Sequence, residues 1–250
     1  MMRLVATFLV ALVIGLVIFL PVRTVYGWVA PADSPVTLHG LDGTVVSARV
    51  NSIAYQTLTI AEDAQWTWRP WKLLLLQFGG IVQADVARGP VLGEVSVTPW
   101  GTVHVSALQG RFNIADLLGL AELGGIGIGG GANLDVRSLK LSSKQFGAVD
   151  GTVTIKDLAW AFGPKNYELG DFEAQFVLEE QALVGTLADT GGPVALEGTV
   201  RVDPVSRSYT LDGRLKLRSS ADPVLGNLIS GSLGRPDAQG WYPLRQQGQL

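Results

Sequence analysis

Over most of its length the chain alternates apolar and polar residues in short runs. The clearest case spans Leu196 to Leu217, where two alternating runs flank a short turn that contains proline and serine. Successive side chains of a strand point to opposite faces, so this alternation predicts strands with one apolar and one polar face. Two such runs joined by a short turn predict an antiparallel hairpin.

The same kind of run recurs along the chain, each time introduced by a glycine and continued by alternating polar and β-branched residues. The spacing of the runs is too irregular for a solenoid of fixed period. A long antiparallel sheet accounts for them, because glycine suits the turn before a strand and β-branched residues suit a half-buried strand. The runs begin at Gly43, Gly93, Gly101, Gly151, Gly198 and Gly213.

Two segments carry leucines at helical rather than alternating spacing. The first, Asn113–Leu123, is predicted to be a helix with Asn113 as its N-cap. The second begins at Asp222 and Pro223 and ends at Gly234, because aspartate caps a helix, proline suits its first position and glycine ends it. The predicted fold class is mainly β: an elongated, curled antiparallel β-sheet domain with one or two short helices.

A tryptophan-rich stretch stands out in the first half of the chain. Trp66 and Trp68 share one face of a predicted strand, and Trp71 follows Pro70, which can begin a short helical turn. The leucine run Leu73–Leu76 is expected to be buried. Large aromatic side chains in strands are usually buried, which favours core packing of the three tryptophans. A partner surface, a groove or a site beside a bilayer remain alternatives.

The start of the chain is apolar without alternation. The run from Leu4 to Val22 is interrupted only by Thr7 and Gly15, and about 20 such residues can span a bilayer. A cleaved signal peptide is the alternative, but its apolar core is usually only about 7–15 residues long. We therefore predict an uncleaved transmembrane helix with the bulk of the chain across the membrane. The predicted anchor residues are Leu4, Phe8, Leu12, Leu16, Phe19 and Leu20.

The predicted organisation is a cytoplasmic leader and anchor over residues 1–27, a linker over 28–35 and one periplasmic β-domain over 36–250. The glycine run at residues 124–131, GGIGIGGG, is the candidate for an internal break. This run fits the dinucleotide-binding pattern G-x-G-x-x-G, which requires a strand before it and a helix after it. Here the predicted helix precedes the run and a strand follows, so a linker is the favoured interpretation.

The composition excludes several classes of function. The formal net charge is −3 and no basic stripe is present, which argues against nucleic-acid binding. The absence of cysteine excludes disulfides and cysteine nucleophiles. The two histidines, His39 and His104, lack an adjacent nucleophile motif, and the acidic pairs at Glu62-Asp63 and Glu179-Glu180 fall in predicted turns. No catalytic residue, cofactor or metal site is predicted, and the protein is not expected to be an enzyme.

A long sheet with one apolar face has to cover that face. A second layer, helices, a protein partner or lipid can do so. From the residues alone we therefore expect a membrane-tethered β-domain whose apolar face is either a closed core or an open groove for lipid.

Several motifs point to a family. They occur in order as LHGLDGT at residues 38–44, AQWTWRP at 64–70 and LEGT at 196–199. The most distinctive ones follow near the C-terminus: YTLDGRL at 209–215, ADP at 221–223 and GRPDAQG at 234–240. With these motifs the chain resembles the type II secretion system protein N family, and the resemblance covers nearly the whole chain.

This resemblance implies a single-pass protein of the bacterial inner membrane with a periplasmic domain and an AsmA-like β-fold. It would be an accessory component of the apparatus that exports folded proteins across the outer membrane, acting through protein–protein interaction. Its partners would be other type II secretion proteins, namely the inner-membrane platform and the secretin, together with membrane lipid. The alternative function is a membrane-tethered module that binds or transfers lipid, with Trp66, Trp68 and Trp71 as candidate interaction or groove residues.

Overall fold

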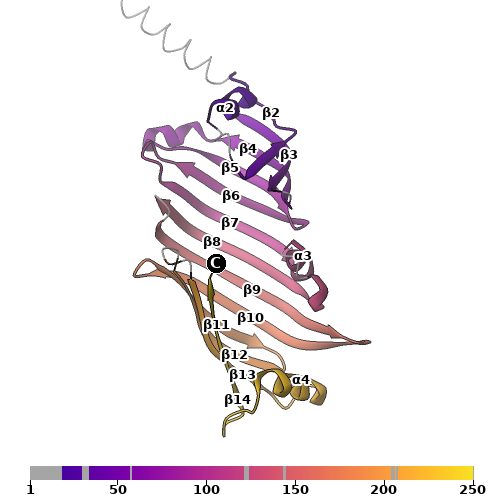
Figure 1. Ribbon diagram of the computed structural model, residues 1–250. Helices are drawn as coiled ribbons and strands as arrows, with labels where there is room; N and C mark the ends of the chain where they lie inside the picture. The colour runs from indigo at the N-terminus through magenta and orange to yellow at the C-terminus, as the bar shows by residue number, and fades with distance from the viewer. Residues whose placement is uncertain are drawn as a thin grey trace, which may run out of the picture.

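One long antiparallel sheet of 14 strands makes up most of the computed structural model (Figure 1). The strands follow chain order, except that β3 pairs with both β1 and the two-residue β2. The sheet is open, with β1 and β14 at the two ends of the strand order, so the predicted mainly β class is confirmed. The structure describes residues 19–29, 34–56, 58–120, 124–142, 145–203, 206 and 208–249.

The strands range from two to 18 residues. They are β1 (Val36–His39), β2 (Asp42–Gly43), β3 (Ser47–Tyr55), β4 (Leu58–Trp68), β5 (Phe78–Val86), β6 (Gly89–Val97), β7 (Val103–Asn113), β8 (Ile128–Ser142), β9 (Gln145–Phe162), β10 (Lys165–Glu179), β11 (Ala182–Gly191), β12 (Val194–Asp203), β13 (Ser208–Leu217) and β14 (Trp241–Gln249). The helical elements are α2 (Val22–Val29), the 3₁₀ helices η1 (Pro70–Leu75) and η2 (Gly124–Ile126), α3 (Ile114–Leu120) and α4 (Pro223–Leu233).

The predicted C-terminal hairpin is confirmed as β12 and β13. Leu196 lies opposite Leu215 and Val202 lies opposite Tyr209, so the apolar residues of both strands share one face. The adjacent position pairs Glu197 with Arg214 on the other face, where their side chains form an ion pair. The alternation seen in the sequence therefore sets the register, because a slip of one residue would reverse the two faces.

Bulges interrupt the ladder at three residues with a left-handed backbone. Asp63, Ala107 and Asp157 have φ of 48°, 50° and 53°, and each lies at a shift of register between neighbouring strands. Bulges increase the right-handed twist of a sheet, and Figure 1 shows the strands turning steeply between the middle of the sheet and β11–β14. The expectation of a turn at Glu62-Asp63 was wrong, because both residues lie inside β4.

Both longer helix predictions are confirmed in position. The Asn113 side chain accepts a hydrogen bond from the amide of Ala115 at 2.9 Å, and α3 follows directly. The Asp222 side chain accepts from the amide of Val224 at 2.8 Å, and α4 runs to Leu233 before Gly234. Side-chain acceptors satisfy amides that lack a partner in the first turn, which is why both sequences begin helices there.

The glycine run does not interrupt the sheet. Its first part forms η2, and its second part is the beginning of β8, which pairs with β7 and β9. Gly130 has φ of 144° where the register between β8 and β9 shifts. A side chain disfavours that conformation, so glycine allows the bulge.

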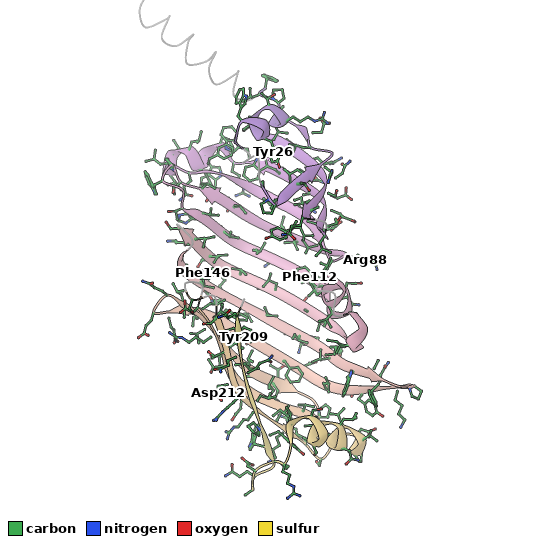
Figure 2. All side chains as sticks on the ribbon, in the orientation of Figure 1. Tyr26, Arg88, Phe112, Phe146, Tyr209 and Asp212 are labelled. Atoms are coloured by element: carbon green, nitrogen blue, oxygen red, sulfur yellow. The ribbon has the colours of Figure 1, made fainter. Side chains whose placement is uncertain are left out.

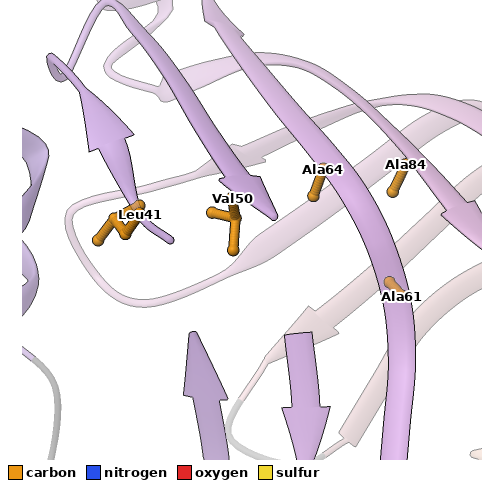
Figure 3. Packing of buried hydrophobic residues seen from close by; sticks show 5 residues of the cluster. All are labelled: Leu41, Val50, Ala61, Ala64 and Ala84. Atoms are coloured by element: carbon orange, nitrogen blue, oxygen red, sulfur yellow. The ribbon is translucent and has the colours of Figure 1, made fainter. Parts of the chain in front are cut away.

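The N-terminal end of the apolar face is covered by α2. Val22 and Tyr26 of this helix pack against a buried cluster, and the Tyr26 hydroxyl donates to the carbonyl of Val36 at 3.4 Å. Figure 3 shows the buried members of this cluster, which come from the residue before β2 and from β3, β4 and β5. Its buried members are Leu41, Val50, Ala61, Ala64 and Ala84.

The C-terminal end of the same face is covered by α4. Leu225 is only 1% exposed, and Ile229 one turn later packs against the same cluster. The Ser230 hydroxyl lies 2.9 Å from the Tyr242 hydroxyl and ties the helix to β14. The other buried members are Tyr167, Phe172 and Val194.

Between these two clusters most of the apolar face is half-buried, although Ala132 of β8 is only 7% exposed. Val105, Leu139 and Val149 lie side by side on β7, β8 and β9, and each is partly exposed. Within the described part of the chain, the buried clusters draw no member from β6, β7 or β8. Helices therefore cover the two ends of the apolar face and leave its middle accessible.

Within the ranges that the structure describes, no helix is long and apolar enough to cross a bilayer. Phe19 is exposed and Leu20 half-buried just before α2. The remaining predicted anchor residues lie outside the described residues: Leu4, Phe8, Leu12 and Leu16.

Candidate interaction surfaces

Two of the three predicted tryptophans meet on the apolar face. Trp66 and Trp68 of β4 each stack with Phe78, the first residue of β5, with ring centroids 5.9 Å and 6.0 Å away. The Trp66 indole nitrogen donates to the carbonyl of Val45 at 3.0 Å, which fixes the ring beside the β2–β3 turn. Both tryptophans are half-buried and Phe78 is exposed. The shared face of the tryptophans follows from their spacing, whereas Phe78 was missed because the stacking crosses strands.

The third tryptophan lies apart, on η1. Trp71 is exposed there, so the structure does not bring it into the aromatic stack. The leucines that follow, Leu73–Leu76, are between 50% and 86% exposed. The expectation that this run is buried was wrong, because the inward position of η1 is occupied by a lysine.

Lys72 is the residue of η1 that points into the protein, with 6% of its surface exposed. Its ammonium lies 3.2 Å from the Glu94 carboxylate and donates to the Ser96 hydroxyl at 3.4 Å. The Ser96 hydroxyl in turn donates to the Gln77 side chain at 3.1 Å. The lysine stem passes over Gly79, where an added Cβ would lie 2.9 Å from its Cδ. A buried lysine needs such partners, and these come from the polar face of β6 and the start of β5.

Backbone hydrogen bonds hold η1 in this orientation. The amide of Arg69 donates to the Gly79 carbonyl at 2.9 Å, and that of Gln77 donates to the Lys72 carbonyl at 3.0 Å. Leu76 ends the helix in a left-handed conformation, with φ of 54°. The leucines are therefore presented outward by a closed turn with both ends tied to the sheet.

The N-terminal segment joins the sheet at the edge that carries η1, meaning the edge formed by the end of β4 and the start of β5. The amide of Val45 donates to the carbonyl of Leu20 at 3.2 Å, and Pro21 forms a β-bridge within the same turn. This turn also meets the end of β4, because the Trp68 amide donates to the Val46 carbonyl at 2.8 Å. Since β4 leads directly into η1, the chain enters the domain beside η1 (Figure 1).

A second surface is a hollow of about 630 Å³ on the polar side of β11–β14, at the end of the sheet opposite Tyr26 (Figure 2). The Arg214 guanidinium lies 4.6 Å from the centre of the Trp241 ring and forms an ion pair with Glu197. Asp212 forms another ion pair with Arg245 at 3.6 Å. The sequence interpretation missed Trp241, whose partner on β13 lies across the α4 segment. Arginine and tryptophan are enriched at protein interfaces, so this hollow is a candidate contact site.

The turn before β14 shapes one wall of this hollow. The Asp237 carboxylate accepts hydrogen bonds from the amides of Trp241 at 2.9 Å and Gln239 at 2.8 Å. Those backbone donors, with the nearby Arg214 charge, hold the pKa of Asp237 below its usual value. The GRPDAQG motif thus ends in a fixed turn that places Trp241 under Arg214.

The two histidines lie on separate strands, β7 and β1. His104 lies opposite Ser96 and Lys140, and partial burial followed by the charges of Lys140 and Lys72 lowers its pKa below 6.5. His39 is the last residue of β1, on a different part of the sheet. Across the described residues, no group of three or more His, Asp or Glu side chains is placed to hold a metal ion.

Comparison with known proteins identifies a family. A family model described as type II secretion system (T2SS), protein N, matches residues 34–245. This range runs from just before β1 into β14 and includes both candidate surfaces. No curated protein and no solved structure matches the chain.

Proposed function

Because the chain belongs to the type II secretion system protein N family, we propose that it is an accessory inner-membrane component of that system. In this role it takes part in the export of folded proteins from the periplasm across the outer membrane by binding other components. The observation that carries the proposal is the family match over 34–245, which spans almost the whole sheet.

The proposed membrane placement is a single N-terminal span with the sheet in the periplasm. It is supported by the apolar run Leu4 to Val22, which has a length of about one bilayer crossing. In this arrangement the membrane span ends before α2, because Val22 and Tyr26 of that helix pack against the sheet. Deletion of residues 1–20 should release the protein from membranes, which fractionation and carbonate extraction would measure.

The hollow lined by Arg214 and Trp241 is the proposed contact site for another secretion component, such as a platform protein or the secretin. A photo-crosslinking amino acid at Arg245, beside the hollow, would test this in native membranes that contain the whole apparatus. The matched control is the same amino acid at Arg88, an exposed residue between β5 and β6. We expect adducts with secretion proteins from Arg245 and not from Arg88. Equal adduct patterns at the two positions would refute the contact site, and unimpaired secretion after deletion of the gene would refute a required role.

The alternative function, binding or transfer of lipid, is favoured by one specific observation. The middle of the apolar face is half-exposed, while α2 and α4 cover its ends. An acyl chain laid across β6–β9 would complete the burial of residues such as Leu139. Native mass spectrometry of the gently extracted full chain is the test, with bound lipid expected from this alternative and a lipid-free mass contrary to it.

A further inference from the structure

We propose that η1 is a second membrane contact, through which the edge of the sheet inserts Trp71 and Leu73–Leu76 into the interface of the bilayer. The ligand of this surface is the lipid bilayer itself, at the level of the headgroups and the first acyl carbons. The contact presupposes the proposed inner-membrane placement and goes beyond it, because it concerns how the folded domain lies against the membrane.

The first argument is the inverted polarity of η1. Its one charged residue, Lys72, is buried, whereas the four leucines that follow are exposed, with Leu74 at 86%. Water would favour the opposite arrangement, since apolar burial is favourable and burying a charge is costly. Contiguous exposed apolar side chains mark contacts with membranes or proteins. The turn therefore has the polarity expected of a segment whose surroundings are apolar.

The second argument is that the fold, rather than the leucines themselves, maintains this exposure. Hydrogen bonds from Arg69 to Gly79 and from Gln77 to Lys72 close the turn, and Glu94 and Ser96 hold the lysine. The leucine side chains themselves remain between 50% and 86% exposed. Removing them from water would therefore cost little rearrangement, as in a preorganised binding surface.

The third argument is location, which favours a bilayer over a protein partner. The carbonyl of Leu20 bonds to the β2–β3 turn at the edge that carries η1, and the apolar run Leu4 to Val22 leads into that point. If this run spans the membrane, η1 lies next to the bilayer surface. Phe19, at the same junction, is also exposed.

The apolar surface continues along the same edge. Val97 at the end of β6 pairs with Phe78 at the start of β5, so the β6–β7 turn is the neighbour of η1. This turn carries Trp100, which is also exposed. Tryptophan favours the headgroup region, where its ring and its indole N–H both find suitable surroundings. Trp71 and Trp100 thus have the positions expected of interface anchors.

The absence of cysteine makes a direct test possible. The full chain carrying Leu74→Cys is labelled with an environment-sensitive fluorophore and reconstituted into phosphatidylethanolamine–phosphatidylglycerol vesicles. The matched control is Leu92→Cys, an exposed leucine on the polar face of β6 away from this edge. We expect a blue shift and quenching by nitroxide-labelled lipids at position 74, and neither at 92. Water-like emission without quenching at 74 would overturn the inference.

Flotation of the same vesicles separates this inference from the proposed membrane placement. Protein that fails to float would overturn both. Protein that floats and resists carbonate extraction, but shows no quenching at position 74, would overturn only the η1 contact. In that case a protein partner would be the occupant, and crosslinking from position 74 would identify it.

A second variant tests whether the leucines act as the contact. In a chain labelled through Trp100→Cys, the double change Leu74→Glu and Leu75→Glu should reduce lipid quenching at position 100, because two carboxylates resist entry into the bilayer. The change Leu92→Glu in the same labelled chain is the control and should leave the quenching unchanged. Undiminished quenching in the double variant, with circular dichroism showing an intact sheet, would contradict the contact.

Discussion

Lys72 shows how one buried charge can determine which way a neighbouring segment faces. Its ammonium pairs with Glu94 and Ser96 on the polar face of β6. If Lys72 turned outward, the Glu94 carboxylate would lose this partner while staying in a partly buried, poorly hydrated site, which is energetically costly. The outward direction of the leucines in η1 is the consequence.

Replacing Lys72 by methionine should therefore destabilise the domain by about 1–3 kcal/mol, because Glu94 loses its main counter-ion in a partly buried site. Urea unfolding followed by tryptophan fluorescence would measure the change. Adding Glu94→Gln should recover part of the loss, since the second change removes a carboxylate whose remaining ion-pair partner is the more distant Arg69, at 3.7 Å. The control Arg137→Met breaks an exposed pair with Asp150, for which a loss below about 1 kcal/mol is expected. Equal losses for the two single variants would show that burial of Lys72 has no special effect.

His104 makes the folding stability of the domain depend on pH, and the direction of this dependence follows from its lowered pKa. Burial and the charges of Lys140 and Lys72 place its folded-state pKa below 6.5, so the folded protein binds a proton less readily than the unfolded chain. Above the unfolded-state pKa of 6.5 the histidine is neutral in both states, and the folded state keeps its full stability. As the pH falls from there through the folded-state pKa, the unfolded chain takes up the proton more readily and the folded state loses stability.

The urea midpoint of the natural chain should accordingly fall between about pH 7.5 and pH 5, and the variant His104→Gln should lose part of that dependence. Carboxylates such as Asp237 add a further decrease, but at a lower pH, since its pKa is itself lowered. A midpoint profile for His104→Gln that coincides with that of the natural chain would contradict this assignment.

At the scale of elements, the sequence predicts those strands and helices that are determined by residues close together in the chain. Alternation identifies β12 and β13, and the caps Asn113 and Asp222 identify the starts of α3 and α4, because each signal lies within a few residues of its effect. The orientation of η1 was predicted wrongly because it depends on Ser96, which lies 24 positions from Lys72. Strand register likewise determines three other features: the stack on Phe78, the bulges and the position of Trp241. A local sequence pattern does not predict this register.

The helix α4 acts as a cover for the C-terminal end of the apolar face, and Leu225 is its most buried residue. Leu225→Ala should lower the free energy of unfolding by about 2–5 kcal/mol, the usual cost of a cavity left by a buried leucine. The neighbouring Val224 is exposed, so Val224→Ala should change it by no more than about 0.5 kcal/mol. Chemical denaturation of both variants would compare them, and a small effect of Leu225→Ala would show that α4 detaches readily from the sheet.

For the molecule as a whole, the unequal covering of the apolar face is the main structural feature. Helices cover both ends, the strands between them are half-exposed, and the proposed membrane contact lies at the N-terminal edge. An open sheet of this length can bind lipid or a protein partner along its apolar face, along its polar face, or along both. The proposed contact with a secretion component uses the polar face, whereas lipid binding uses the apolar face.

Two matched substitutions distinguish the faces. Leu139→Asp places a carboxylate in the half-exposed middle of the apolar face, and Leu92→Asp places one on the polar face. If lipid covers the apolar face, Leu139→Asp should abolish bound lipid in native mass spectra while circular dichroism shows an intact sheet, because half-exposed positions tolerate charge better than buried ones. Leu92→Asp should retain the lipid. Loss of folding in Leu139→Asp would instead identify a closed core, and retained lipid in both variants would place the ligand elsewhere on the molecule.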